Sequence, residues 1–210
     1  MSGPDLSFET AARARGARLV AGVDEVGRGP LAGPVTAAAV ILPEAGLPDG
    51  LNDSKKLTPA RREVLAAWIA AHCDCAVVHV GVEEIERLNI LRASHLAMCR
   101  ALSALRQRPC LALIDGNRLP EGLDCPGETI VKGDALSLSI AAASILAKVA
   151  RDRLMVDLAQ QHPGYGWEAN AGYPTPAHLQ ALLDLGVTPH HRRSFAPVHN
   201  ILCKDGLASA

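Results

Sequence analysis

The sequence predicts an α/β fold in which a mixed β-sheet is flanked by helices and followed by a C-terminal helical extension. Two apolar strand-like segments come first, and helices then alternate with further strands, which is the order expected of a sheet covered on both faces. The length of 210 residues is typical of one domain. Because 49% of the residues are hydrophobic and only 3% are aromatic, we expect a core built mainly from Ala, Leu, Val and Ile.

The first two strands are predicted over residues 18–26 and 35–42, after a polar lead-in over residues 1–17. Val20 and Val23 give the first segment its apolar character, and a proline ends the second. The short link between the two segments is rich in Gly and Pro, which favours an antiparallel hairpin.

A polar loop over residues 51–57 precedes a helix that we expect to end at His72. Thr58 is a favourable N-cap residue, and Pro59 suits the first helical position because its fixed φ matches a helix. Residues 75–82 then alternate with β-branched side chains and predict a third strand.

Apolar residues at spacings of three and four predict one long amphipathic helix over residues 83–106, which Pro109 stops. Short buried strands are expected over residues 110–114 and 129–132. A helix is then predicted over residues 136–161, and the small Ala and Ser residues near its start allow close approach to the sheet.

The remaining chain is broken by Gly and Pro until Thr175 and Pro176 begin another helix, which Gly186 closes. We therefore predict a main domain over residues 18–164 and a C-terminal helical extension over residues 165–210, packed together as one structural unit.

Bulk composition does not point to a nucleic-acid or membrane partner, because 21 Lys and Arg against 22 Asp and Glu give a net charge of −1. The longest nearly uncharged apolar run, residues 136–147, is shorter than the roughly 20 residues that span a bilayer. The N-terminus lacks the basic-then-apolar order of a secretory signal. We expect a cytoplasmic monomer whose six cysteines are free thiols.

Four carboxylates are predicted at the ends of strands: Asp24, Glu25, Asp115 and Asp134. Each follows an apolar stretch and lies near a glycine, which places its charge at the edge of the core, where an unpaired carboxylate is costly. Oxygen-only ligands favour hard cations such as Mg²⁺ or Mn²⁺. Two such ions would suit phosphodiester hydrolysis.

The pattern alone leaves other interpretations open. Adjacent residues of a regular strand face opposite ways, so Asp24 and Glu25 can share a site only if the strand bends, as nearby glycines would allow. Glu25 could instead be a solvated strand-end charge, Asp115 part of an Asp-Gly turn, and Asp134 the N-cap of the next helix.

Several segments resemble a known family in colinear order from about residue 18 to 200. GVDEVGRGPLAGPV closely resembles the signature of bacterial ribonuclease HII, the type 2 ribonuclease H. The further matching segments are NDSKKL at 52–57, LIDGN at 113–117, KGD at 132–134, AAASILAKV at 141–149, GYPT at 172–175 and HRRSF at 191–195.

This resemblance implies a ribonuclease H-like fold and endonucleolytic hydrolysis of the RNA strand of RNA/DNA hybrids, including incision 5′ of a single ribonucleotide in duplex DNA. It implies 3′-hydroxyl and 5′-phosphate products and two Mg²⁺ or Mn²⁺ ions. By position, the four carboxylates match the family's catalytic metal ligands. Gly27, Arg28 and Gly29 match the segment that senses the ribose 2′-hydroxyl, and Tyr173 matches the tyrosine that packs on the neighbouring deoxyribose.

Further substrate contacts are expected from basic or polar residues of the matching segments, namely Ser54, Lys55, Lys56, Lys148 and Arg193, with Arg192 as a further contact to the DNA backbone. Asn170 and Ala171 depart from the His-Lys of many relatives, and we expect somewhat weaker nucleic-acid affinity from that change. Two other classes are the alternatives: a module that binds RNA/DNA junctions without cutting, and another two-metal nuclease such as a junction resolvase or integrase.

The net charge fits a polyanionic substrate once the acids are placed. Without the four strand-end carboxylates, 18 acidic residues remain against 21 basic ones. The rest of the protein is therefore mildly basic, which predicts modest, salt-sensitive affinity for nucleic acid.

Overall fold

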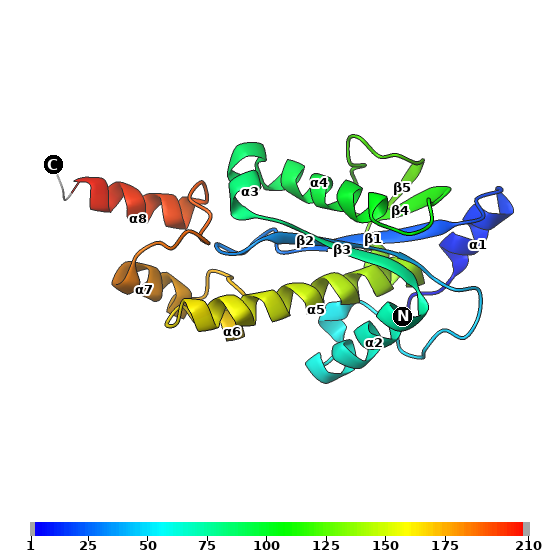
Figure 1. The fold of residues 1–210 in the computed structure, drawn as a ribbon, viewed down its shortest axis with the longest axis horizontal. Helices are drawn as coiled ribbons and strands as arrows, with labels where there is room; N and C mark the ends of the chain where they lie inside the picture. The colour runs from blue at the N-terminus through cyan, green and yellow to red at the C-terminus, as the bar shows by residue number, and fades with distance from the viewer. Residues whose placement is uncertain (1–2, 208–210) are drawn as a thin grey trace.

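The computed structural model describes the backbone of residues 3–207 and the side chains of residues 3–203. Its centre is one five-stranded sheet with the order β3-β2-β1-β4-β5 and with helices on both faces (Figure 1). The strands are β1 (Val20–Val26), β2 (Val35–Ile41), β3 (Asp74–Val80), β4 (Leu111–Asp115) and β5 (Gly127–Ile130). Each lies within two residues of its predicted bounds, so the predicted mixed α/β sheet is confirmed.

The sheet combines an antiparallel and a parallel half. β1 pairs antiparallel with β2, and β2 pairs antiparallel with β3, as the predicted hairpin requires. On the other side, β1 pairs parallel with β4, and β4 pairs parallel with β5. The carboxyl ends of β1, β4 and β5 therefore meet at one edge of the sheet, and that edge carries the strand-end acids.

Two helical layers cover the sheet. The helices are α1 (Ser7–Ala14), α2 (Pro59–His72), α3 (Val82–Leu88), α4 (Ile90–Ser103), α5 (Leu138–Gln161), α6 (Trp167–Asn170), α7 (Pro176–Leu185) and α8 (Ala196–Leu207). Figure 1 shows α3 and α4 on one face of the sheet and α5 with α2 on the other. In the described part of the chain, none of these helices is long and apolar enough to cross a membrane.

Helix α5 packs closely on β1 and β2. Its residues Ala141, Ala142 and Ala143 are fully buried, as the prediction of a small-residue front required. Just before them, the backbone of Ser139 lies against Gly22 of β1, and a Cβ at Gly22 would lie 2.1 Å from the backbone carbon of Ser139. The interface therefore has no room for one additional methyl group.

The N-terminal lead-in contains a helix that the sequence pattern did not reveal. α1 packs through Phe8 and Ala12 on Val20 and on other buried side chains at the amino end of the sheet. Its Glu9 is buried and accepts hydrogen bonds from the backbone N–H and Oγ of Ser139 and from a second serine hydroxyl. The helix is stabilised by these contacts with residues distant in sequence. The local sequence of the segment gives no sign of them.

The single helix predicted over residues 83–106 was wrong, because the segment forms two helices. Asn89 lies between them with a φ of 67° and a ψ of 164°, which is far from helical geometry and interrupts the helix. Its side-chain oxygen accepts hydrogen bonds from the N–H groups of Leu91 and Arg92 and so caps α4. Apolar residues recur at spacings of three and four on both sides of Asn89, so the sequence pattern did not indicate the break.

The C-terminal residues pack at the far end of α5. Trp167, which is 1% exposed, and Leu182 belong to an apolar cluster with Met155 of α5. The predicted helix that begins after Thr175 is confirmed, with the Thr175 side chain accepting from the N–H of His178 and Gly186 at the end.

Gly22→Ala should destabilise the fold, since the new methyl group would overlap the backbone of α5. We expect a loss of about 3 kcal/mol or more in the free energy of unfolding, measured by urea denaturation. Gly81→Ala is the matched control, because a Cβ there meets nothing within 4 Å and the φ of −73° suits any residue. Equal effects at the two positions would contradict this explanation.

Candidate active site

The four strand-end carboxylates gather at the carboxyl edge of the parallel half of the sheet. Asp24 and Glu25 lie near the end of β1, and Asp115 is the last residue of β4. Asp134 lies in a 3-10 turn, η2 (Gly133–Ala135), that follows β5. The Asp115 Oδ1 atom accepts a hydrogen bond of 2.6 Å from the N–H of Gly133, so that turn is tied to the end of β4.

Asp24 and Glu25 approach the site from opposite faces of β1. The strand stays regular through Val26, which pairs with Thr36, and the bend comes afterwards at Gly27, where φ is +95°. Asp24 is directed toward α5, where the Ser144 hydroxyl lowers the pKa of its carboxyl against the effect of burial. Glu25 lines a cavity of about 370 Å³ with Asp115 and residues of α4. No bend between the two acids is needed, because both lie where the strand leaves the sheet.

Each carboxylate has a local partner. Arg28 Nη1 lies 3.3 Å from Glu25 Oε1, and Lys55 Nζ lies 3.9 Å from Asp134 Oδ2. Asp24 Oδ1 accepts from the N–H of Glu25 at 2.8 Å. Arg28 and Lys55 are the cations paired with these acids in the described part of the chain, so the cluster retains an excess of negative charge.

Burial and mutual repulsion raise the pKa values of three of these acids. Burial is the main cause for Asp24, whose pKa is well above its usual value, and the charges of Glu25, Asp115 and Asp134 add to the shift. Burial also raises the pKa of Glu25 against the opposing effect of Arg28. The pKa of Asp134 is raised by burial and by neighbouring acids. The cluster would therefore be stabilised by additional positive charge.

The donor set fits a hard divalent cation, because every side chain of the cluster offers carboxylate oxygens. Within residues 3–203, no three His, Cys, Asp or Glu side chains converge on one point that could hold an ion as they stand. Glu25 and Asp134 are held by Arg28 and Lys55 instead. A bound cation would have to compete with these two basic groups.

The alternative interpretations of single acids do not fit the structure. The Glu25 side chain is only 13% exposed, so it is not a solvated strand-end charge. Asp115 bonds across to η2 rather than within an Asp-Gly turn. The N-cap of α5 is Ser137, whose oxygen accepts from the N–H of Ile140, so Asp134 does not have that role.

The Gly27–Gly29 segment and Tyr173 lie together although they are far apart in sequence. A Cβ at Gly29 would lie 3.3 Å from Cε1 of Tyr173, so the ring rests against the glycine backbone. Tyr173 is 41% exposed, which leaves much of its ring free to contact another molecule. These residues form one surface, which we call the Gly29–Tyr173 surface.

Two of the predicted phosphate contacts are corrected by burial. The Ser54 side chain is buried and its Oγ lies 2.8 Å from the Oγ of Ser144, so the hydroxyl is not free for a phosphate. Arg192 is fully buried and donates to backbone carbonyls, so it does not contact DNA backbone. In both cases the side chain forms hydrogen bonds within the protein that stabilise the fold.

The other predicted contacts lie at or near the surface. Lys55, Lys56 and Arg193 are exposed. Lys148 is partly buried, and its Nζ lies 2.7 Å from Oδ1 of Asp152.

Asn170 and Ala171 shape the turn before Tyr173. Asn170 donates to the carbonyl of Tyr165 and accepts from the N–H of Gly172. Ala171 has a φ of 49°.

Sequence reasoning also missed several residues that support the site. The Ser144 hydroxyl is hydrogen-bonded to Ser54 and lowers the pKa of Asp24, and a single hydroxyl within an Ala-rich segment was the available signal. Arg151 is fully buried and left no such signal, because its partners are backbone carbonyls. Arg192 was expected from the sequence, but as a contact to DNA rather than as a buried group.

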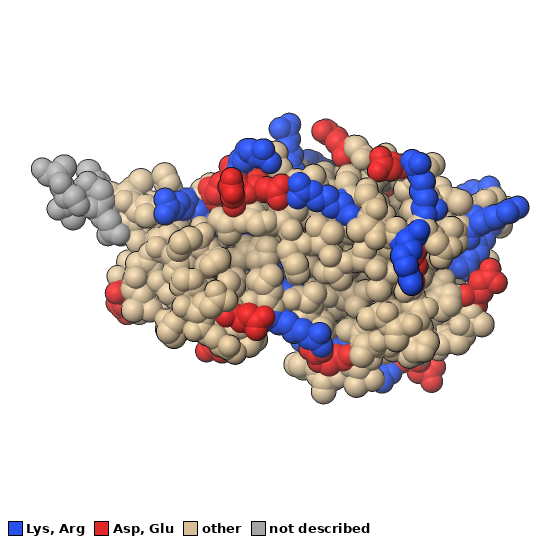
Figure 2. All heavy atoms as spheres, in the orientation of Figure 1, with Lys and Arg blue, Asp and Glu red and all other residues tan. Residues whose placement is uncertain are grey.

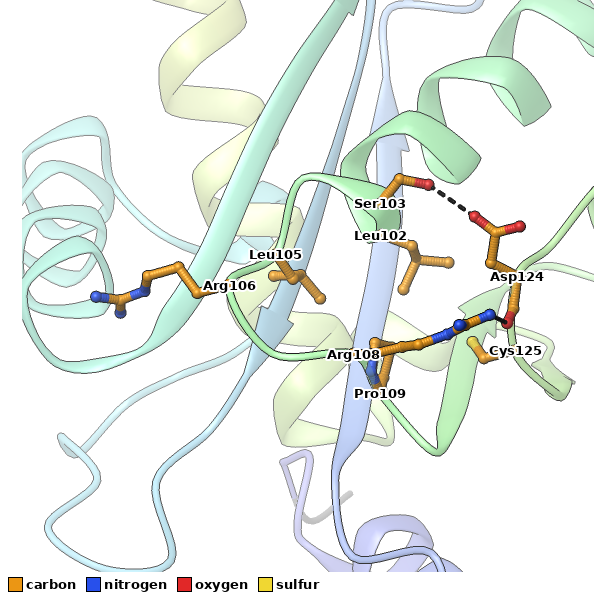
Figure 3. A pocket seen from close by; sticks show the side chains of 8 residues that line it. All are labelled: Leu102, Ser103, Leu105, Arg106, Arg108, Pro109, Asp124 and Cys125. Atoms are coloured by element: carbon orange, nitrogen blue, oxygen red, sulfur yellow. Dashed lines mark hydrogen bonds between the residues drawn. The ribbon is translucent and has the colours of Figure 1, made fainter.

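A second cavity, of about 450 Å³, lies at the other end of the strands (Figure 3). It is lined by Pro109, which precedes β4, and by Cys125, which precedes β5. Its Ser103 donates to the Asp124 carboxylate and its Arg108 donates to the Asp124 carbonyl (Figure 3). Because the strand-end acids are at the opposite edge, this cavity is not part of the candidate site.

Charges on the face in view do not form a large patch of one sign. Figure 2 shows acidic and basic side chains beside one another over the α3–α4 layer. Glu84 there is paired with Arg87 and Arg100. The concentrated charge of this protein is the acidic cluster at the sheet edge.

Solved structures with this fold include nucleases. The crystal structure of ribonuclease H2 from Pyrococcus horikoshii OT3 matches with a TM-score of 0.76 and 30% identity, covering 89% of this chain and 98% of that one. The structure of Bst-RNase HIII in complex with Mn²⁺ matches with a TM-score of 0.74 and 20% identity, covering 92% of this chain and 72% of that one, and supports the fold alone.

Sequence comparison gives the family. Ribonuclease HII of Paracoccus denitrificans (strain Pd 1222) is 75% identical over 209 residues, covering 100% of both chains. The family model described as Ribonuclease HII matches residues 21–198, a range that contains every strand-end acid and the Gly29–Tyr173 surface. This chain belongs to the ribonuclease HII family of endoribonucleases.

Proposed function

We propose that this protein hydrolyses the RNA strand of RNA/DNA hybrids and incises 5′ of single ribonucleotides embedded in duplex DNA, leaving 3′-hydroxyl and 5′-phosphate ends. Its role would be the removal of ribonucleotides from DNA. The observation that carries the proposal is the position of four carboxylates beside the Gly29–Tyr173 surface. One group of residues can act on a phosphodiester while the other contacts the adjoining sugars.

Asp24, Glu25, Asp115 and Asp134 are the proposed metal ligands and catalytic residues. When bound, Mg²⁺ or Mn²⁺, two ions in our proposal, would supply positive charge that activates water and stabilises the leaving oxygen. Carboxylate oxygens are the ligands that these hard cations prefer, and membership of the ribonuclease HII family supports the use of a divalent ion. The chain's own part is to hold the carboxylates together at the ends of β1 and β4 and in η2.

The Gly29–Tyr173 surface is the proposed reader of the sugar. Glycine lets the backbone approach a ribose closely, since no side chain intervenes, and the 2′-hydroxyl is the group that separates RNA from DNA. The Tyr173 ring can pack on the neighbouring deoxyribose. Lys55, Lys56, Lys148 and Arg193 are proposed phosphate contacts. We propose a monomer, because both parts of the site come from one chain.

The direct test is a DNA duplex with one embedded ribonucleotide, incubated with Mg²⁺ or Mn²⁺ beside the same duplex made wholly of DNA. We expect a single cut 5′ of the ribonucleotide and no cut in the DNA duplex. Equal cleavage of both duplexes, or of neither, would refute the proposed function.

Asp24→Asn should abolish cleavage and leave the fold intact, because the amide keeps the shape of the side chain and removes its charge. We expect kcat to fall by about 100-fold or more, measured on the ribonucleotide duplex, with an unchanged circular dichroism spectrum. Activity close to that of the unmodified protein would mean that the metal site is elsewhere.

The same substitution should stabilise the metal-free protein. The raised pKa of Asp24 means that the folded state binds a proton more tightly than the unfolded chain, so its charge lowers stability at neutral pH. In EDTA at pH 7, we therefore expect Asp24→Asn to increase the free energy of unfolding. The gain should shrink as pH falls toward 3.8, the ordinary pKa of this carboxyl. A destabilised variant at pH 7 would contradict this assignment.

Tyr173→Ala should impair cleavage at a single ribonucleotide by about 10- to 100-fold in kcat/KM, since it removes a packing surface worth about 1–3 kcal/mol. Tyr173→Phe is the matched control and should retain most of the activity, because the ring remains. Steady-state kinetics on the ribonucleotide duplex distinguish the two. An unchanged rate for Tyr173→Ala would remove the ring from substrate recognition.

A further inference from the structure

Two arginines are buried beneath the Gly29–Tyr173 surface without a carboxylate partner. Arg151 of α5 and Arg192, which follows α7, are both 0% exposed. Neither belongs to any ion pair among the side chains that the structure describes. Asp152, the nearest acid in sequence to Arg151, is paired with Lys148. A buried cation is costly unless it is fully hydrogen-bonded, so the contacts of these two groups need a reason.

Main-chain carbonyls of one loop are the acceptors of Arg192. Its Nη2 donates to the carbonyls of Gly27 at 2.6 Å and Gly33 at 2.9 Å. Its Nη1 donates to the carbonyl of Arg28 at 3.1 Å, and its Nε donates to that of Gly33 at 3.0 Å. The planar guanidinium thus fixes both ends of the loop over residues 27–33.

Arg151 holds the same loop to the segment before Tyr173. Its Nε donates to the carbonyl of Pro34 and its Nη2 to that of Ala32. Its Nη1 donates to the carbonyl of Ala171 at 2.9 Å. Arg151 therefore links the two parts of the Gly29–Tyr173 surface.

The carbonyl contacts determine which way the peptide N–H groups point. No peptide bond in the described residues is cis, and in a trans peptide the N–H is directed opposite to the carbonyl of the preceding residue. Since the carbonyls of Gly27 and Arg28 are directed at Arg192, the N–H groups of Arg28 and Gly29 are directed away from it. Neither N–H has a hydrogen-bond acceptor within the described residues.

We propose that Arg192 is a positioning residue for ribose recognition, because it turns the N–H groups of Arg28 and Gly29 outward as paired donors to the substrate, while Arg151 aligns the Tyr173 segment beside them. The proposal rests on the proposed function. It gives the two buried guanidinium groups a role that a surface basic residue could not fill.

The charge of the two arginines also favours a polyanion. Burial lowers the pKa of Arg192 to about 9 and that of Arg151 to about 10, so both stay protonated at neutral pH. Their positive charge lies directly under a surface that would receive a sugar-phosphate chain. The hydrogen-bond acceptors of these two guanidinium groups are backbone carbonyls, which carry no net charge.

Arg192→Lys tests the positioning role, because lysine keeps the charge and loses the planar fork. We expect kcat/KM on the ribonucleotide duplex to fall by about 100-fold, with the affinity for an all-DNA duplex in EDTA unchanged. Arg192→Met should lower both, since the charge is also lost. Arg153→Lys and Arg153→Met are the matched controls, because Arg153 is an exposed arginine on the same helix as Arg151 and pairs with Glu63.

The outcomes separate this proposal from the proposed function. Failure of the unmodified protein to cut the ribonucleotide duplex would refute the function before any variant is made. If the unmodified protein cuts and Arg192→Lys prefers ribonucleotide over DNA equally well, the positioning role is overturned. An equal loss in Arg153→Lys would assign the effect to general stability and overturn it too.

Amide hydrogen exchange on the unmodified protein provides a test that does not depend on a variant folding. The N–H groups of Arg28 and Gly29 should exchange rapidly in the free protein. In EDTA, a duplex containing one ribonucleotide should slow their exchange, and an all-DNA duplex should slow it less. Protection already present in the free protein, or equal protection by both duplexes, would overturn the proposal.

Discussion

The close packing of α5 along β1 is the contact on which the site depends. Residues 22–27, which comprise most of β1 and the glycine after it, and residues 139–151 of α5 each span about 17 Å. The strand and the helix therefore advance together. Gly22 meets the backbone of Ser139, and Gly27 meets the side chain of Arg151. Between these contacts, the Ser144 hydroxyl lies close enough to Asp24 to lower the pKa of its carboxyl against the effect of burial. One helix thereby positions a strand-end acid and the start of the loop over residues 27–33.

The parallel pairing of β1 with β4 adds the electrostatic part. It places Asp115 beside Asp24 and Glu25 at one sheet edge. Burial and the neighbouring negative charges raise the pKa values of Asp24 and Glu25 there, and the nearby basic side chains do not cancel this effect. Such an arrangement lowers the stability of the metal-free protein. A bound divalent cation would offset the repulsion among these carboxylates. Membership of the ribonuclease HII family supports the use of such a cation.

The cationic groups are divided between two tasks. Arg28 and Lys55 lie against the acids. Arg151 and Arg192 lie beneath the neighbouring loop and donate to main-chain carbonyls of that loop, of Pro34 and of Ala171. Acidic and basic regions of the site therefore adjoin without neutralising one another. This separation is what the proposed function requires, with metal at one part and a polyanion at the adjacent part.

The sequence by itself determined the strands, the hairpin, the helix caps at Thr58 and Thr175, and the placement of acids at strand ends, because these follow from local periodicity and local backbone preferences. Only the tertiary structure decided that α1 forms, that Ser54 is buried and that Arg192 supports a loop instead of DNA. These outcomes depend on partners more than 80 residues away. A polar side chain has the same local pattern whether water or a distant carbonyl satisfies it, so the chain must fold before the two can be distinguished.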